Sequence, residues 1–302
     1  MSSVSPPIPD DLLRVSDLEA ESLAALLDLA ADMKTRPHGF VEALRGDTLV
    51  CFFEKPSTRT RVSFAAAAER LGMFPLLIRP DELQLGRGET VEDTARTLSG
   101  YAQAIVIRTF AQETVERIAA AAKAPVINAL TDDHHPCQAL ADLLTLRERF
   151  GRLEGLRVAY VGDGNNVATS LVEAGALAGM DVVVACPPGY EPKVDGARVV
   201  HDPREAVADA DAVYTDVWVS MGEESEREER LRTMEPYRVD QALMAAARAD
   251  TVFMHCLPAH RGEEVTADVI DGPQSVVWQQ AENRLPTEEA LLLALVSRRW
   301  KA

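Results

Sequence analysis

Several signals that define common protein classes are missing from this 302-residue sequence. No apolar run approaches the roughly 18 residues of a membrane-spanning helix. The first residues, MSSVSPPIPDD, lack the basic segment followed by an apolar one that is typical of a signal peptide. The four cysteines are widely scattered and form no Cys-x-x-Cys pair, which argues against a zinc ribbon or a disulfide framework. We therefore expect a cytoplasmic protein with no membrane partner.

Positive charge is also scarce, because 31 Lys and Arg residues face 48 Asp and Glu residues and the net charge is −17. Such a balance argues against wholesale binding to nucleic acid or to anionic membranes. A local group of arginines is more informative against this background than it would be in a basic protein.

Short apolar runs alternate with helical patterns along both halves of the chain. Alternating strands and helices predict parallel sheets with helices on both faces. The sequence therefore predicts an α/β fold with two doubly wound parallel-sheet domains of similar size. The predicted strands are 48–53, 73–78, 104–108, 125–129, the start of 157–166, 181–186, 212–216, 251–256 and 275–280.

Helices are predicted between these strands. Ser16-Asp-Leu-Glu19 has the pattern of a capping box and predicts a helix from there to about Lys34. The mixed-charge segment GEESEREERL (222–231) is typical of a solvated helix. The other predicted helices are 57–71, a helix from about Thr90, 112–122, a helix after Pro136, one ending near Gly179, and 287–299.

The stretch FEKPSTRTRVSFAAAAERLG (53–72) breaks a local rule of helix chemistry. Its predicted helix begins at the N-cap Ser57, and the first turns carry arginines instead of acidic residues. A helix N-terminus already has partial positive charge and unpaired N–H groups, so cations there cost stability unless an anion lies against them. Broken local rules tend to mark functional sites.

An anion cradle explains this stretch. The N–H groups of Thr58, Arg59 and Thr60, together with hydroxyls and a guanidinium, would suit a phosphate group. The alternative is an ordinary capped helix whose arginines reach solvent or a carboxylate such as Glu54.

Polar residues follow two other predicted strands. Arg108 stands at the C-terminal end of a strand, where open α/β sheets place ligands. His135 could donate to a carbonyl oxygen, and Gln138 offers a donor and an acceptor to a planar amide. A lone histidine such as His135 is more often structural. Cys137, between the two, favours packing over nucleophilic catalysis because no dedicated base is evident.

The Gly-rich turn GDGNN (162–166) lacks the third glycine of a dinucleotide-binding fingerprint. This argues against a dehydrogenase.

Four motifs in their order along the chain together resemble the aspartate/ornithine transcarbamoylase family. They are Ser57-Thr-Arg-Thr60, Arg108, His135-Pro-Cys-Gln138 and His255-Cys-Leu-Pro258. The resemblance covers essentially the whole chain. DVWVSMG (216–222) and HCLPAHRG (255–262) are similar to second-substrate segments of the ornithine-specific members of the family.

The resemblance implies carbamoyl transfer from carbamoyl phosphate to the δ-amine of L-ornithine, with no cofactor and no metal. Thr60, Arg108 and His135 would converge on the carbamoyl oxygen, and Gln138 would hold the carbamoyl amino group. Cys256 and Arg59 complete the implied catalytic set. The implied carbamoyl phosphate contacts are Ser57, Thr58, Arg59, Thr60, Gln84, Arg108, His135, Pro136, Cys137, Gln138 and, from the second domain, Arg284.

On the ornithine side the resemblance implies contacts from Asn166, Asp216, Ser220, Met221, Cys256 and Leu257. It also implies an architecture: a carbamoyl phosphate domain (1–133), an ornithine domain (134–286), and a terminal helix (287–302) that returns to the first domain. Members of the family are built on catalytic trimers, so we expect a homotrimer or a multiple of trimers.

Two alternatives stay open at this point. One is a carbamoyltransferase for another amine, such as putrescine or an acylated ornithine. Asp216 with the Ser-Met-Gly segment counts against it, because a free α-amino acid head needs such partners. The other is a non-catalytic phosphate-binding protein, which the complete set of donors disfavours.

Overall fold

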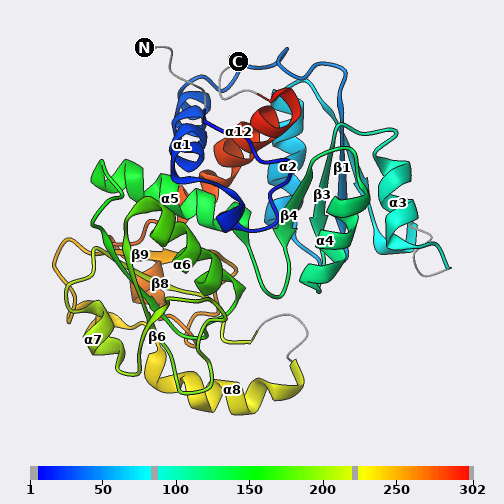
Figure 1. The fold of residues 1–302 in the computed structure, drawn as a ribbon. Helices are drawn as coiled ribbons and strands as arrows, with labels where there is room; N and C mark the ends of the chain where they lie inside the picture. Colours follow the sequence, from blue (N-terminus) through cyan, green and yellow to red (C-terminus); the bar gives the residue numbers. More distant parts are fainter. Residues whose placement is uncertain (1–5, 83–87, 220–223, 299–302) are drawn as a thin grey trace. The chain divides into compact units, whose positions relative to one another are not determined.

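The computed structural model describes residues 6–82, 88–219 and 224–298. The chain divides into two compact units (Figure 1). Unit 1 comprises the residues up to Leu144 and those from Asn283 onward, and unit 2 comprises Thr145–Glu282. Each unit contains one parallel sheet with flanking helices, as the alternating pattern predicts.

Unit 1 is built on a four-stranded parallel sheet with the order β2-β1-β3-β4. Its strands coincide closely with predicted apolar runs: β1 (Thr48–Phe53), β2 (Phe74–Ile78), β3 (Ala104–Arg108) and β4 (Val126–Leu130). β1, β3 and β4 are almost wholly buried, which explains why their sequences are continuous apolar runs without polar alternation.

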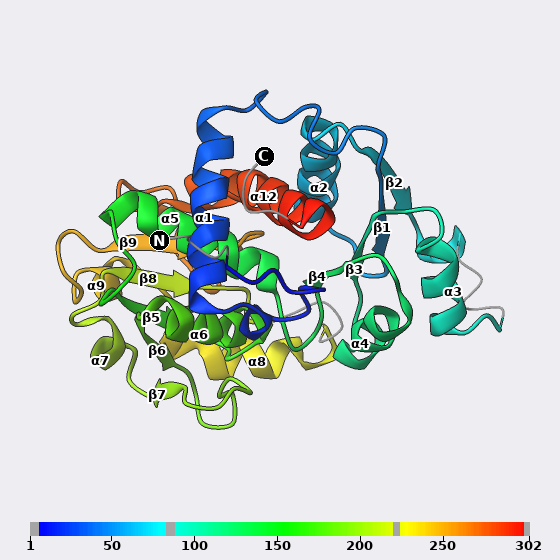
Figure 2. The same ribbon diagram turned by 45° about the horizontal axis from the view of Figure 1, so that its top comes forward.

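The helices of unit 1 form two groups (Figures 1 and 2). α3 (Val91–Leu98) packs against α4 (Gln112–Ala121), and α12 (Arg284–Ser297) packs against both α1 (Ala20–Thr35) and α2 (Thr58–Arg70). α12 thus returns the end of the chain to unit 1. It begins at Arg284, earlier than the predicted start at Thr287.

Unit 2 has a five-stranded parallel sheet with the order β7-β6-β5-β8-β9. The strands are β5 (Arg157–Val161), β6 (Asp181–Ala185), β7 (Arg198–Val200), β8 (Ala212–Thr215) and β9 (Val252–His255). β7 was not predicted, because three partly exposed residues leave no apolar run. The helices are α6 (Asn166–Ala178), α7 (Pro203–Val207), α8 (Arg227–Met234), α9 (Gln241–Met244), α10 (Ala267–Ile270) and α11 (Val277–Glu282).

The helix α5 (Pro136–Phe150) spans the division between the units at Leu144 and Thr145. The sequence placed the boundary earlier, after residue 133, and assigned residues up to 286 to the second domain. In the structure, residues 134–144 and 283–286 belong to unit 1. His135, Gln138 and Arg284 therefore all lie in unit 1.

The strand predicted at 275–280 is wrong. Ser275 forms only an isolated bridge with Phe253, after which the chain turns into α11. Val277 and Gln280 are buried three residues apart, which is the spacing of a helix face. The adjacent valines are β-branched and favour a strand locally, but the tertiary contacts determine the outcome.

The capping box predicted at Ser16 is also wrong. The carboxylate of Asp17 instead accepts from the backbone N–H groups of Leu13 (2.7 Å) and Arg14 (2.9 Å). This forms a short 3-10 turn, η1 (Val15–Asp17), and α1 begins later, at Ala20. The solvated helix predicted at 222–231 is confirmed from Arg227 onward, where α8 is mostly exposed, whereas Glu224–Glu226 form a 3-10 turn.

No helix within the described ranges combines the length and apolar character that crossing a membrane requires.

The turn after α2 depends on Gly72, whose φ is +84°. A Cβ atom there would lie 2.4 Å from the carbonyl oxygen of Val41. Gly46 provides a matched control, because its φ is +89° and a Cβ atom there would meet nothing within 4 Å.

We therefore expect Gly46→Ala to lower the free energy of unfolding by about 1–2 kcal/mol through backbone strain alone. Gly72→Ala should cost about 1–3 kcal/mol more, because the clash with backbone forces the turn to move. Urea unfolding followed by circular dichroism measures both values. Equal losses in the two variants would contradict the role assigned to close packing at Gly72.

Candidate functional site

The strand ends of unit 1 deliver three polar segments to one edge of the sheet. The parallel register pairs Phe53 with Arg108 and Arg108 with Leu130, so β1, β3 and β4 end together. The segments that follow carry the start of α2, Arg108 itself and the residues that lead into α5. Open α/β sheets bind ligands at this edge.

The start of α2 has the predicted N-cap. The hydroxyl of Ser57 accepts from the N–H of Thr60 at 3.2 Å, and the first turn contains no acidic residue. One part of the prediction needs correction, because the Thr60 N–H is engaged by Ser57 and does not face outward as a free donor. The hydroxyl of Thr60 is buried and takes part in a second contact.

That contact comes from Arg284, the first residue of α12, whose side chain is buried. Its Nη2 atom donates to the Thr60 hydroxyl at 3.2 Å, and its Nη1 atom donates to Oε1 of Gln138 at 2.9 Å. On its other edge the guanidinium donates to Glu288, from Nη2 at 2.7 Å and from Nε at 3.1 Å. Arg284 therefore joins the starts of α2, α5 and α12.

His135 is buried at the same place. Burial lowers its pKa well below the usual value, and the guanidiniums of Arg284, Arg108 and Arg59 lower it further. The imidazole is thus neutral at physiological pH. A neutral ring can still donate a hydrogen bond, while the three arginines supply the positive charge. This arrangement suits an anion next to an uncharged polar group.

Gln138 and Cys137 have different surroundings within α5. The Nε2 atom of Gln138 donates to Asp142 at 2.8 Å, which fixes which end of the amide faces Arg284. The thiol of Cys137 is buried and donates to the carbonyl of Asn128 at 3.4 Å. Burial raises the pKa of Cys137 to about 12, so the thiol is unsuited to act as a nucleophile.

Unit 2 contains a second polar cluster at the ends of β8 and β9. The register pairs Thr215 with His255, so Asp216 and Cys256 follow neighbouring strand ends. The buried carboxylate of Asp216 accepts from the Cys256 thiol at 2.9 Å and from Nδ2 of Asn165 at 2.9 Å. Cys256 itself is only partly buried.

Asn165 was missed by sequence reasoning, which selected its neighbour Asn166. Asn165 is the N-cap of α6, and its Oδ1 atom accepts from the N–H groups of Val167 (2.9 Å) and Ala168 (3.2 Å). Because Oδ1 caps the helix, Nδ2 is directed to Asp216. Asn166 is the first residue of α6 and is half-buried. The N-cap preference for Asn fits either residue, so no local signal separated the two.

The backbone after Cys256 is held by a buried pair. Nδ1 of His255 accepts from the N–H of Leu257 at 2.8 Å, and Nε2 lies 3.2 Å from Oε1 of Glu264. Leu257 has a φ of +58°, which a leucine rarely adopts. Gln280 adds a contact by accepting from the His255 N–H at 2.9 Å. Glu264 and Gln280 were not predicted, since nothing local marks them as partners of His255.

Three predicted site residues, Gln84, Ser220 and Met221, lie outside the described residues.

Two groups of potential metal ligands occur among the described residues: Asp216 with His255 and Cys256, and His260 with Glu263 and Glu264. In the first, both ring nitrogens of His255 already have partners. In the second, Glu263 is ion-paired with Arg227, which opposes a further cation. We assign no metal to either.

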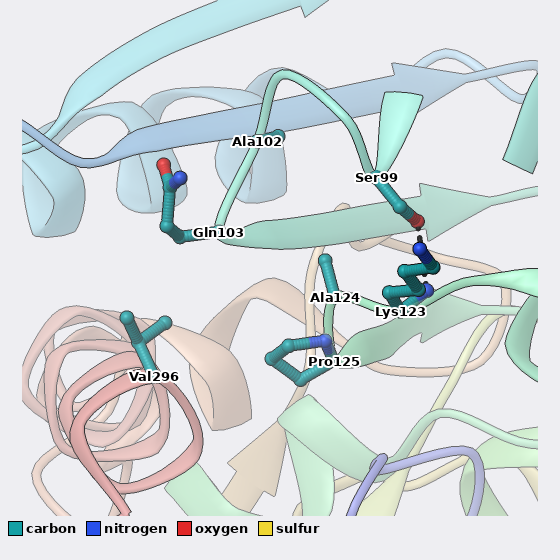
Figure 3. Close-up of a pocket in the computed structure, with 7 residues that line it drawn as sticks. All are labelled: Ser99, Ala102, Gln103, Lys123, Ala124, Pro125 and Val296. Atoms are coloured by element: carbon teal, nitrogen blue, oxygen red, sulfur yellow. Dashed lines mark hydrogen bonds between the residues drawn. The ribbon is translucent and has the colours of Figure 1, made fainter. Parts of the chain in front are cut away.

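A shallow pocket of about 240 Å³ lies elsewhere in unit 1 (Figure 3). It is lined by Ser99, Gln103, Lys123 and Pro125 among others, and its wall includes Val296 of α12. The Ser99 hydroxyl accepts from the backbone N–H of Lys123. None of the predicted site residues lines it.

Two family descriptions match the chain. "Aspartate/ornithine carbamoyltransferase, carbamoyl-P binding domain" matches residues 10–148, and "Aspartate/ornithine carbamoyltransferase, Asp/Orn binding domain" matches residues 154–295. The chain belongs to the aspartate/ornithine carbamoyltransferase family. The second match includes α12 up to residue 295, which the structure assigns to unit 1.

Individual relatives within the aspartate/ornithine carbamoyltransferase family are similar over nearly the full length. The chain is 54% identical over 298 residues to an ornithine carbamoyltransferase of Parafrankia sp., covering 93% of this chain and 94% of the relative. It is 52% identical over 300 residues to that of Bacillus subtilis, covering 95% and 93%. The structure of the Pyrococcus furiosus ornithine carbamoyltransferase superimposes with a TM-score of 0.91 at 50% identity, covering 97% of this chain and 98% of that one.

The role of the residues around His135 in binding carbamoyl phosphate can be tested without the second substrate. Arg59 lies near His135 and is partly buried, whereas Arg61, two residues further on, is exposed. Arg59→Ala should weaken the binding of carbamoyl phosphate by about 1.5–3 kcal/mol, the value of a charge-assisted hydrogen bond. Calorimetric titration of the folded variants measures this loss.

Arg61→Ala is the matched control, because it removes the same charge from the same helix. It should bind within about twofold of the wild type, as expected for an exposed charge. Equal weakening in both variants would show that net charge, and not the geometry at Arg59, holds the anion.

Proposed function

We propose that this protein transfers the carbamoyl group of carbamoyl phosphate to the δ-amine of L-ornithine, giving L-citrulline and phosphate. The observation that carries this proposal is the identity of about half of all residues to proteins named ornithine carbamoyltransferase, over more than nine-tenths of both chains. One of these relatives, from Pyrococcus furiosus, is named as anabolic. A role in arginine biosynthesis follows from the same similarity.

Unit 1 supplies the carbamoyl phosphate site in this proposal. The helix start at Ser57–Thr60 and the guanidiniums of Arg59 and Arg108 hold the phosphate. Thr60, Arg108 and the neutral His135 donate to the carbamoyl oxygen. Gln138 takes the carbamoyl amino group, and Arg284 approaches from α12. Gln84, Pro136 and Cys137 complete the proposed contacts.

Unit 2 supplies the ornithine site. The buried Asp216 carboxylate accepts from the α-ammonium group, and Asn166, Ser220 and Met221 serve the α-carboxylate. Cys256 and Leu257 line the region of the reacting amine. The Cys256 thiol contacts Asp216 directly, so the two act as one polar surface.

The chemistry is direct displacement. The neutral δ-amine attacks the carbamoyl carbon, negative charge gathers on the carbonyl oxygen, and the bond to phosphate breaks. Donors fixed before the reaction stabilise that charge without reorganising, which is usually the largest contribution to catalysis. The departing phosphate accepts the proton that the amine loses. Because the amine must be neutral, the rate rises with pH as it deprotonates.

We propose the cytoplasm as the compartment. All four cysteines are free thiols in the structure, and three of them are buried. A reducing environment suits such a set.

The identity of the amine can be tested with a panel of substrates. The wild type should prefer ornithine over putrescine by at least about tenfold to a hundredfold in kcat/KM, because putrescine lacks the ammonium and carboxylate of the amino acid head and forgoes the contacts proposed for them, such as that with Asp216. Ureido product formed from each amine with carbamoyl phosphate is the measurement.

Asp216→Asn should reduce the preference for ornithine over putrescine, since it removes the charge but keeps nearly the same side-chain volume. Equal kcat/KM values of the wild type for the two amines would contradict the ornithine assignment and favour a carbamoyltransferase for another amine. Failure to form any ureido product would favour a phosphate-binding protein without catalysis.

A homotrimer, or a multiple of trimers, is the proposed assembly. Unit 1 exposes large apolar side chains on its edge strand β2 and on α2, which pack against one another. Phe74 is 66% exposed and Val62 is 61% exposed, and Leu76 and Val41 are also exposed. Apolar side chains on a sheet edge favour contact with another copy.

Sedimentation equilibrium should give a mass of about three times 32.9 kDa or a multiple of it. Phe74→Asp combined with Val62→Asp should shift the mass toward the monomer, because charge in the contact is costly. Trp278→Asp in unit 2 is the matched control, since Trp278 is 61% exposed but distant in sequence from these elements. A fully active monomeric wild type would refute the assembly.

A further inference from the structure

Glu288 contacts the guanidinium of Arg284 from within the same helix. It lies one turn along α12 from Arg284 and is only 1% exposed. Its Oε1 atom accepts from both Nη2 and Nε of Arg284, at 2.7 and 3.1 Å. This double contact orients the guanidinium, so that Nη1 and Nη2 are directed at Gln138 and Thr60.

In the proposed function the same guanidinium also contacts carbamoyl phosphate. Arg284 carries one positive charge, and the carboxylate of Glu288 neutralises it when it is ionised. A dianion arriving at the site must share Arg284 with this carboxylate in surroundings where water does not screen the repulsion. A proton on Glu288 removes that repulsion.

The guanidinium of Arg284 keeps its orientation when Glu288 becomes protonated and loses its charge. A protonated carboxyl group keeps a carbonyl oxygen, which still accepts from Nε and Nη2 of Arg284. The protonated form therefore leaves Arg284 in position but with its positive charge uncompensated. A glutamine at this position has the same geometry and the same charge as the protonated form.

We propose, on the basis of the proposed function, that Glu288 is a positioning residue for Arg284 that also competes with carbamoyl phosphate for its charge, so that ligand binding and protonation of Glu288 favour each other. Nothing in the resemblance to the family assigns a role to this position.

The titration range of Glu288 makes this coupling observable near neutral pH. Burial raises the pKa of Glu288 to about 7, although Arg284 and the Ser63 hydroxyl favour the ionised form. A bound dianion raises that pKa further. The affinity for carbamoyl phosphate is therefore greatest below about pH 7, where Glu288 is protonated. It falls as the pH rises and the carboxylate of Glu288 ionises.

Three other titratable groups close to Glu288 or Arg284 do not change their charge near neutral pH. Burial raises the pKa of the Cys137 thiol to about 12 and that of Cys51 higher still, while the pKa of His135 is lowered, so these three are neutral near pH 7. Among the described residues, Glu289 on α12 interacts electrostatically with Glu288, and Asp142 on α5 does so with Arg284. Other charged groups act on their neighbours: Arg59 on α2 and Arg108 on β3 on His135, Arg61 on Cys51, Arg70 on Glu289, and Lys34 on α1 donates to Asn283.

Glu289 is a matched control for Glu288. It is the next residue on α12, it is 3% exposed, and burial raises its pKa to about 7 as well. Its partner, however, is Arg70 at 3.2 Å, which is outside the proposed site. Glu289 thus shares the helix, the burial and the titration range but lacks the contact with Arg284.

The experiment compares carbamoyl phosphate binding to the wild type, Glu288→Gln and Glu289→Gln between pH 6 and pH 8.5, by calorimetry and from KM. At pH 6 the wild type and Glu288→Gln should bind alike. By pH 8.5 Glu288→Gln should bind about tenfold more tightly, which corresponds to a pKa shift of about one unit on ligand binding. Glu289→Gln should follow the wild type at every pH.

Proton uptake gives a second measurement, and in the wild type it requires no substitution. Calorimetry in buffers of different ionisation enthalpy should show that the wild type and Glu289→Gln take up more protons on binding than Glu288→Gln does near pH 7. An unchanged affinity ratio across the pH range, or the same response in Glu289→Gln, overturns the proposal while leaving carbamoyl transfer intact. A wild type that neither binds nor uses carbamoyl phosphate overturns both.

Discussion

The hydrogen bonds of the buried Arg284 side chain determine how the starts of three helices in unit 1 are held together. One guanidinium reaches the N-cap region of α2 through Thr60, the first turn of α5 through Gln138, and its own helix through Glu288. A buried charge with so many donors is costly to place unless each donor finds an acceptor. The three helix starts are therefore fixed relative to one another by the requirement to satisfy a single side chain.

The parallel sheets supply the frame within which this contact can form. In unit 1 the strands β1, β3 and β4 end in register, and in unit 2 the strands β8 and β9 do the same. Continuous apolar runs bury the strands on both faces, and the first polar residue after each run emerges at the same edge. Arg108, Asp216 and Cys256 owe their positions to this rule, and none of them needs a special loop to be placed.

Much of this arrangement was predictable from the sequence. The runs TLVCFF and AIVIR form strands because their apolar character extends over the length of a buried strand, and Ser57 caps α2 because its hydroxyl lies where the first N–H groups need an acceptor. The motifs that resemble the family identify the residues of the two clusters. Local chemistry is sufficient for the strands and for the cap, whereas the cluster residues come from the resemblance.

Other features depend on contacts between distant residues and were not predictable. The valines before α11 favour a strand locally, yet the chain turns into a helix that buries Val277. Asn165 and Asn166 are chemically identical, and only the position of the helix start decides which one reaches Asp216. The pairing of His255 with Glu264 and the return of Arg284 to unit 1 are set by tertiary packing alone.

The division of the chain between the units has a consequence for synthesis on the ribosome. Unit 2 is one continuous segment, Thr145–Glu282, so all of its strands have been synthesised before α12. Unit 1 is discontinuous, and α12, which packs against α1 and α2, is the last described helix. Domains fold as units once their sequence is available. The unit whose first residues are translated first is therefore the unit that finishes folding last. Until α12 packs against them, the apolar faces of α1 and α2 stay uncovered.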